Sequence, residues 1–162
     1  MEISIRAIKT EEFEKLAEVT NGAYEIPYKP GMFVTRANDS ADKIREEISF
    51  GAEIFVAEVD GKMAGAIRTN VFDGILMFYK LAVGGDFRNR GIGGQLIKYV
   101  FERYGKLGFK KVEIEVCESK GLIPYYESFG FSVVERYFHN GHYEVRMERE
   151  LSTKFGFDAC YI

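Results

Sequence analysis

Apolar and polar residues alternate over residues 3–7, which is the two-residue period of a half-buried strand. Thr10 and the acidic pair Glu11 and Glu12 follow, ahead of apolar residues at helical spacing. A threonine can cap free helix amides and early acids suit the helix dipole, so we expect Thr10 to open a helix. The chain therefore begins as a strand followed by a helix.

Residues 21–39 hold two of the three prolines and several aromatic residues without a regular period, which predicts an ordered loop or a broken helix. Loops of this kind often border substrate sites. Asp39 or Ser40 is expected to cap a second helix, with Ile44 and Ile48 facing inward.

Two Asp-Gly pairs, at residues 60–61 and 73–74, separate runs of strand-forming residues and predict three antiparallel strands joined by tight hairpins. A helix is expected over residues 91–104 from its apolar face, and it leads into an alternating strand over residues 111–116. Such a strand-helix-strand crossover should be parallel and right-handed. A short helix over residues 121–129 and a final hairpin about Asn140-Gly141 complete the prediction.

Length and composition fit one globular domain over residues 1–162, because 46% hydrophobic residues suffice for a core. The net charge of −3 and the pI of about 5.6 give no electrostatic reason to bind nucleic acid. Residues 1–16 alternate and carry charge, unlike a signal peptide, and no apolar run approaches a membrane span. We therefore expect a cytoplasmic protein without a membrane or nucleic-acid partner.

The two cysteines, Cys117 and Cys160, are interpreted as free thiols, since a chain of this size does not need a disulfide. The two histidines, His139 and His142, flank the Asn-Gly turn without a further ligand at metal-binding spacing. No metal site is expected.

The stretch LAVGGDFRNRGIGG, residues 81–94, places an apolar strand, two arginines and several glycines directly before the predicted helix. The first amides of a helix are unpaired and together with its dipole form an anion site. Glycine lets a phosphate approach the backbone, and Arg88 and Arg90 can each donate two hydrogen bonds to it. A plain glycine loop with solvated arginines is the alternative, but the order of these features favours a phosphate cradle.

Two common phosphate-binding motifs fit poorly. A Walker loop is excluded, because no Gly-Lys-Ser/Thr follows the glycines. A dinucleotide fingerprint beginning at Gly91 would place Leu96 where a small residue belongs, and antiparallel strands precede it.

The residues Arg88-Asn89-Arg90-Gly91-Ile92-Gly93 match the R/Q-x-x-G-x-G/A motif, and the segment from Tyr126 to Phe131 is similar to Y-x-K-x-G-F. Both motifs are typical of the GNAT superfamily of N-acetyltransferases, which the chain resembles in order and spacing from Ile75 to Leu151. The resemblance implies an α/β (α+β) fold with a mixed, mostly antiparallel sheet of about six or seven strands, helices on both faces, and a cofactor slot where the fourth and fifth strands splay apart.

By the same resemblance the co-substrate is acetyl-CoA. Its pyrophosphate would bind the loop that starts the helix, and its pantetheine arm would bind the backbone of the preceding strand. The implied cofactor-binding residues are Leu81, Ala82, Val83, Arg88, Asn89, Arg90, Gly91, Ile92, Gly93, Gly94, Ser119 and Tyr126.

The resemblance assigns the catalytic role to Tyr126. When an amine attacks a thioester, an oxyanion develops and the thiolate leaves more readily if a proton donor is in reach. A phenol, with an ordinary pKa of about 10, is protonated at neutral pH and can be that donor. The alternative is that Tyr126 only packs a helix face, as its neighbour Tyr125 would.

The chain departs from the family pattern at Ser119, which stands where many relatives have asparagine, at Leu122 in place of alanine, and at Ser128 in place of lysine. Relatives often carry a glutamate on the fourth strand, and residues 75–83 contain none. Glu113, Glu115 or a water chain therefore remain open as the general base. The family resemblance favours direct transfer of the acetyl group over a covalent intermediate on Cys117.

The leading hypothesis is acetyl transfer from acetyl-CoA to a primary amine of unknown identity, on a small molecule or a peptide. The second is a non-catalytic acyl-CoA-binding or regulatory module of the same fold, and a nucleotide-binding module of another class is the third. Tyr24, Tyr28 and Phe33 are candidates to line the acceptor site or to pack on the core as a lid. A homodimer through the last hairpin or the tail is a further expectation.

Overall fold

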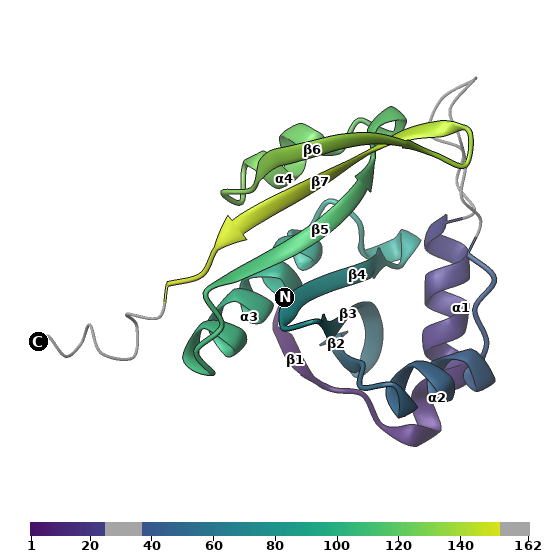
Figure 1. Cartoon of the computed structure of the whole chain (residues 1–162). Helices are drawn as coiled ribbons and strands as arrows, with labels where there is room; N and C mark the ends of the chain where they lie inside the picture. The colour runs from purple at the N-terminus through teal and green to yellow at the C-terminus, as the bar shows by residue number, and fades with distance from the viewer. Residues whose placement is uncertain (25–36, 153–162) are drawn as a thin grey trace, which may run out of the picture.

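The computed structural model describes residues 1–24 and 37–152, and these form one seven-stranded sheet with helices on both faces (Figure 1). The spatial order of strands is β1-β2-β3-β4-β5-β7-β6. Neighbouring strands are antiparallel except for the pair β4 and β5. Their bounds are β1 Ile3–Ala7, β2 Glu53–Val59, β3 Lys62–Phe72, β4 Ile75–Val83, β5 Lys111–Cys117, β6 Ser132–His139 and β7 His142–Glu150. The mixed, mostly antiparallel sheet expected from the sequence is confirmed.

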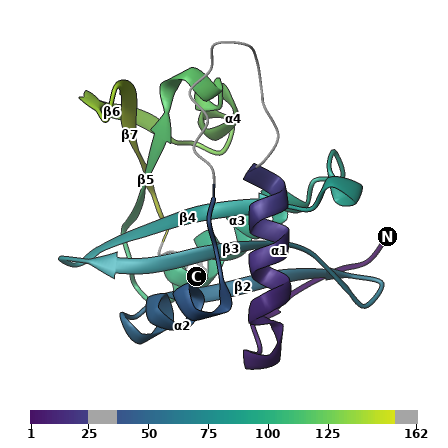
Figure 2. The same cartoon turned by 90° about the vertical axis from the view of Figure 1, so that its right-hand side faces the viewer.

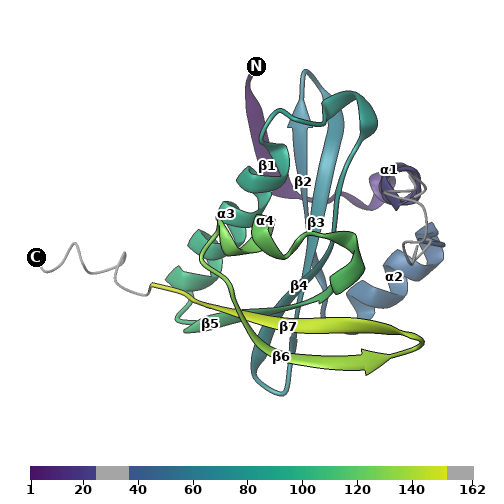
Figure 3. The ribbon, with the colours of Figure 1, turned by 90° about the horizontal axis from the view of Figure 1, so that it is seen from above.

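The helices are α1 Phe13–Tyr24, α2 Ala41–Ser49, α3 Ile92–Lys106 and the short α4 Ile123–Glu127. Figure 3 shows α3 on one side of strands β1 to β4 and α1 and α2 on the other side. In Figure 2, α1 crosses in front of β3 and β4, and α4 lies beside β5.

Each face of the sheet buries its own core, because successive side chains of a strand point to opposite faces. The core on the α3 face includes Ile67, Phe78 and Leu96. The core on the opposite face, under α1 and α2, includes Leu16, Ile44 and Val56. Burial on both faces explains why the middle of β3 is buried at eight successive positions.

The predicted turns are confirmed at all three hairpins. Asp60-Gly61, Asp73-Gly74 and Asn140-Gly141 each have two positive φ angles, which asparagine, aspartate and glycine tolerate best. The predicted parallel crossover through α3 is also confirmed by the pairing of β4 with β5.

Two predictions on the first helices were wrong. Thr10 does not cap α1: it lies inside a short 3-10 turn, and the Glu12 carboxylate accepts the Lys9 N–H at 2.9 Å to close the turn. Ser40 does cap α2, and Ile44 is buried, but Ile48 is exposed. The inward position at that end of α2 belongs to Glu47, whose carboxylate accepts hydrogen bonds from the sheet.

The expected loop at residues 21–39 begins later than predicted, since α1 continues to Tyr24. Ala23 is buried, and the Tyr24 hydroxyl donates to the Leu81 carbonyl of β4 at 3.2 Å. These contacts offset the poor helix propensity of Gly22. Tyr28, Phe33 and Cys160 lie outside the described residues.

Candidate functional site

Strands β4 and β5 separate soon after they pair. Their parallel register holds at Leu76 with Val112 and at Met77 with Glu113. Beyond this point a cavity of about 160 Å³ lies between Phe78–Leu81 of β4 and Ile114–Cys117 of β5. We call it the slot cavity.

A β-bulge in β4 borders this split. Ala66 pairs with Ala82 and Arg68 with Tyr79, so the one intervening residue of β3 faces both Lys80 and Leu81. Lys80 has a φ of 49°, which is uncommon for a residue with a side chain. A bulge redirects the strand and leaves local backbone groups outside the ladder, which suits a strand that must face a ligand.

The start of α3 has the geometry expected of an anion site. Gly91 is the N-cap, with a left-handed φ of 78°, and its carbonyl accepts the Gln95 N–H at 3.0 Å. The amides of the first turn precede the first intrahelical bonds and are therefore available to a ligand. The side chains of this turn are small, because Gly93 and Gly94 follow Ile92.

A second cavity, of about 350 Å³, lies over this helix start, and we call it the loop cavity. It is lined by most of the residues to which the family resemblance assigned cofactor binding, namely Leu81, Ala82, Val83, Arg88, Asn89, Gly91, Ile92, Gly93, Gly94 and Tyr126. The tertiary structure therefore adds Tyr126 of α4 to strand, loop and helix residues that are already contiguous in the chain.

The structure places three of the predicted side chains in specific contacts. Arg88 lines the loop cavity and donates from Nη2 to the Ala23 carbonyl at 3.2 Å, near the end of α1. Arg90 lines neither of the two cavities, and its guanidinium lies over the Phe87 ring at 5.8 Å from the centroid. Ser119 also lines neither cavity, and its Oγ lies 3.3 Å from the Cys117 Sγ.

Tyr126 borders both cavities, whereas its neighbour Tyr125 borders only the loop cavity. The Tyr126 ring packs against Phe78 of β4 at 6.2 Å and against Phe131 at 6.0 Å, measured between centroids. These contacts fix the ring at the border between the two cavities.

The two glutamates of β5 differ in their surroundings. Glu113 is buried and forms ion pairs with Arg146 at 3.4 Å and Lys111 at 3.7 Å. Glu115 is exposed, lines the slot cavity and interacts with the Tyr137 hydroxyl. Burial, together with the charges of Glu115 and Glu144, raises the pKa of Tyr137 to about 12, so its hydroxyl is a donor at neutral pH.

Cys117 also lines the slot cavity and is a free, buried thiol. Within the described part of the chain, no group of three His, Cys, Asp or Glu side chains is placed to hold a metal ion. None of the helices in the same residues is both long enough and apolar enough to cross a bilayer.

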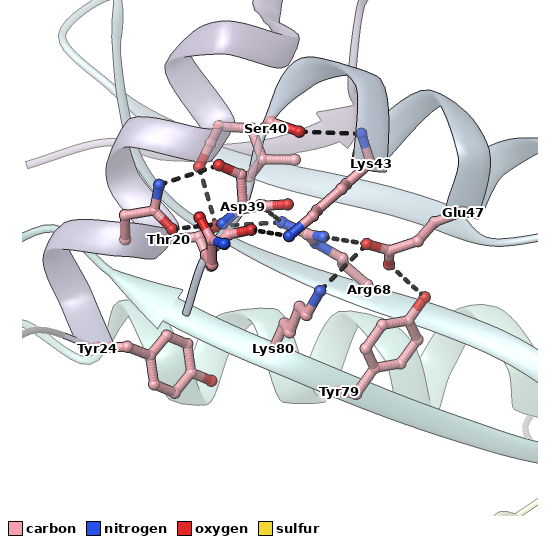
Figure 4. Close-up of polar contacts among 12 residues, drawn as sticks. Thr20, Tyr24, Asp39, Ser40, Lys43, Glu47, Arg68, Tyr79 and Lys80 are labelled. Carbon is pink, nitrogen blue, oxygen red and sulfur yellow. Dashed lines mark hydrogen bonds and ion pairs between the residues drawn. The ribbon is translucent and has the colours of Figure 1, made fainter. Parts of the chain in front are cut away.

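A buried ionic cluster supports the β4 bulge from the face of the sheet that α1 and α2 cover, opposite α3 (Figure 4). The fully buried Arg68 of β3 pairs with Asp39, ahead of α2, and with Glu47 of α2 at 2.7 Å. Glu47 also accepts from the Tyr79 hydroxyl at 2.7 Å and from Lys80 Nζ at 3.2 Å. The cluster thus connects α2 to both β3 and the bulge of β4.

Sequence reasoning missed Arg68 and placed Tyr24 in a loop instead of at the end of α1. Arg68 lies in the alternating run of β3 and gave no sign that a charged side chain would be buried there. Tyr24, a candidate to line the acceptor site, ends α1 and borders both cavities. Leu16, Thr20 and Ala23 follow one another at helical spacing and are all buried. This spacing was the sequence signal that α1 continues as far as Tyr24.

The GNAT acetyltransferase domain model matches residues 26–151 of the chain. The chain belongs to the GNAT acetyltransferase family. An uncharacterized N-acetyltransferase of Methanocaldococcus jannaschii is 38% identical over 89 residues, which is 50% of this chain and 39% of that protein. The chain therefore matches well under half the length of this curated relative.

Solved GNAT structures share the fold at low sequence identity. The ribosomal-protein-S18-alanine N-acetyltransferase of Escherichia coli superposes with a TM-score of 0.76 at 20% identity, over 93% of this chain and 95% of that one. The PaiA N-acetyltransferase of Thermoplasma acidophilum, solved with coenzyme A, gives 0.78 at 20% identity over 93% and 99%. A phosphinothricin acetyltransferase of Sinorhizobium meliloti, solved with acetyl-CoA, gives 0.76 at 16% over 94% and 90%.

Proposed function

We propose that this GNAT chain transfers an acetyl group from acetyl-CoA to a primary amine by direct attack. The observation that carries the proposal is that two neighbouring cavities share the lining residues Tyr24, Leu81, Leu122 and Tyr126. One cavity lies over the open amides of α3, and the other lies in the split between β4 and β5. An extended cofactor with an anionic end and a reactive end would occupy both.

The residues present fit such a cofactor. The first amides of α3 suit a diphosphate, because they are unpaired donors at the positive end of the helix dipole. Leu81 to Val83 line the same cavity next to the bulge, so their backbone would bind the pantetheine arm as an added strand. Arg88 supplies a cation, while Arg90 and Ser119 are less well placed for the contacts that the family pattern implies.

Acetyl-CoA supplies an activated thioester. Side chains of the slot cavity would accept a proton from the attacking amine and donate one to the leaving thiolate. We assign Tyr126 as the donor to the leaving thiolate, since it is the tyrosine of α4 that reaches both cavities. Its ring is held by Phe78 and Phe131, which would orient the hydroxyl.

We assign Glu115 rather than Glu113 as the base that removes a proton from the amine. Glu115 lines the slot cavity, whereas Glu113 does not line it and forms ion pairs with Lys111 and Arg146. The Tyr137 hydroxyl holds the Glu115 carboxylate from the β6 side. A carboxylate in this position can both attract an ammonium group and accept its proton.

Release of free coenzyme A thiol, measured over a panel of amines with acetyl-CoA, tests the proposal. We expect saturable release with at least one class of amine and no binding of NAD in a parallel titration. Acetyl-CoA binding without release for any amine would instead favour the non-catalytic module, and binding of NAD alone would reject the family function for this chain.

A further inference from the structure

Resting on the proposed function, we infer that the acceptor carries a carboxylate in addition to the amine, and that Lys120 binds this carboxylate. The acceptor class is then a small amino acid or a close derivative rather than a polyamine. The inference follows from the charges that border the slot cavity, which are those of Lys80, Glu115 and Lys120.

The charge of Lys80 is already balanced. Its Nζ lies 3.2 Å from Glu47, which also pairs with Arg68, and Arg68 in turn pairs with Asp39. Arg68, Lys80, Asp39 and Glu47 are two cations and two carboxylates, so their charges balance. Figure 4 shows the contacts among them. A ligand would have to compete with Glu47 for the Lys80 ammonium.

Lys120 differs from Lys80 in having no carboxylate partner among the described residues. Its Nζ lies over the Tyr24 ring, 5.3 Å from the centroid, which holds a cation without neutralising it. The nearest acid in the sequence, Glu118, is paired with Arg136 at 2.6 Å. The ammonium of Lys120 is therefore available to an anion in the slot cavity.

Glu115 is the complementary charge of the same cavity, and it interacts with the neutral Tyr137 hydroxyl. One available anion on β5 and one available cation just beyond β5 match a ligand that bears one positive and one negative group. With its amine at Glu115, an amino acid would place its carboxylate toward Lys120. A polyamine would place a second cation there and be repelled.

The net charge of the whole chain would by itself suggest a different class of acceptor. A net charge of −3 would favour a polycationic acceptor if the field of the entire surface decided specificity. Charges in direct contact with the ligand are less screened than distant ones, so the local pair should dominate.

Matched pairs of acceptors test the inference with the unmodified protein. Each pair consists of an amino acid and the amine left after its decarboxylation, such as methionine with 3-methylthiopropylamine, phenylalanine with phenethylamine, and lysine with cadaverine. We expect kcat/KM to be about 10- to 100-fold higher for the carboxylate-bearing member, as one charge-assisted hydrogen bond allows.

In the Lys120→Met variant, the ratio of kcat/KM between the amino acid and its decarboxylated amine should fall close to one. Lys120→Arg should keep most of the wild-type ratio, because the cation is kept. Lys98→Met is the matched control, since Lys98 is an exposed lysine of α3 that lines neither cavity. It should leave the ratio unchanged.

Equal or better turnover of the decarboxylated amines would overturn the inference while leaving acetyl transfer intact. A Lys120→Met variant that raised KM for acetyl-CoA as much as KM for the amino acid would also overturn it, because Lys120 would then bind the cofactor. Failure of every amine to release thiol would overturn the proposed function and the inference together.

Discussion

At the scale of single residues, position relative to the two cavities separates side chains of the same type that lie close together in the chain. Tyr125 and Tyr126 are adjacent, and both border the loop cavity, but Tyr126 also borders the slot cavity. The same criterion separates Glu115 from Glu113 on β5. Each pair provides a test in which one member is the control for the other.

Replacing Tyr126 with Phe should lower kcat by about 100-fold and change KM for acetyl-CoA little, because the ring and its packing are kept while the proton donor is lost. Tyr125→Phe should leave kcat nearly unchanged. Steady-state thiol release gives both constants. An unaltered kcat in Tyr126→Phe would remove this hydroxyl from the mechanism.

Glu115→Gln should lower kcat/KM for the amine by about 100-fold at neutral pH. The loss should shrink as the pH rises toward the pKa of the free amine, since the substrate then arrives deprotonated. Glu113→Gln breaks ion pairs with Arg146 and Lys111 and should affect stability more than rate. A pH profile that is equally depressed at every pH in Glu115→Gln would argue against a proton-accepting role.

At the scale of elements, α1, α2, β3 and β4 are held together by the buried cluster around Arg68 (Figure 4). The Arg68 guanidinium donates a hydrogen bond to the Thr20 hydroxyl of α1 at 3.2 Å, in addition to its ion pairs with Asp39 and Glu47. Glu47 then links this core to Tyr79, where burial and the Glu47 carboxylate raise the pKa of the phenol. The β4 bulge is therefore supported by a network that lies on the face opposite α3.

We expect Arg68→Met to lower the free energy of unfolding by about 3 to 5 kcal/mol, because the Asp39 carboxylate would remain buried without its cation. Denaturant unfolding followed by circular dichroism measures the change. Arg45→Met is the control: Arg45 pairs with Asp42 on the exposed face of α2 and its loss should cost about 1 kcal/mol at most. A similar small loss in both variants would show that the cluster adds little to stability.

At the scale of the whole molecule, the cofactor should stabilise the fold because its cavities are built from α1, β4, α3 and α4 together. Acetyl-CoA at 100 times its Kd adds about 2.7 kcal/mol to the native state. For a domain of this size the melting temperature should rise by about 5 to 10 °C. Thermal unfolding with acetyl-CoA and with NAD measures this, and equal shifts for both ligands would contradict a specific site.

The sequence alone determined the features that depend on neighbouring residues. The Asp-Gly and Asn-Gly turns follow from residues that tolerate positive φ, and the crossover through α3 follows from the strand-helix-strand order. The glycine turn that opens α3 at Gly91 was predictable for the same reason, since strand, glycine turn and helix start are contiguous in the chain.

Only the tertiary structure decided which distant groups meet. Periodicity reports that a side chain faces a sheet or a helix, but it carries no information on the partner across the interface. The burial of Arg68 between Asp39 and Glu47, the inward turn of Glu47 in place of Ile48, and the position of Tyr24 below Lys120 all depend on how α1 and α2 pack on β3 and β4. The family resemblance implied the split of β4 from β5, but only the positions of both strands show that Glu115 and Lys120 border one cavity there.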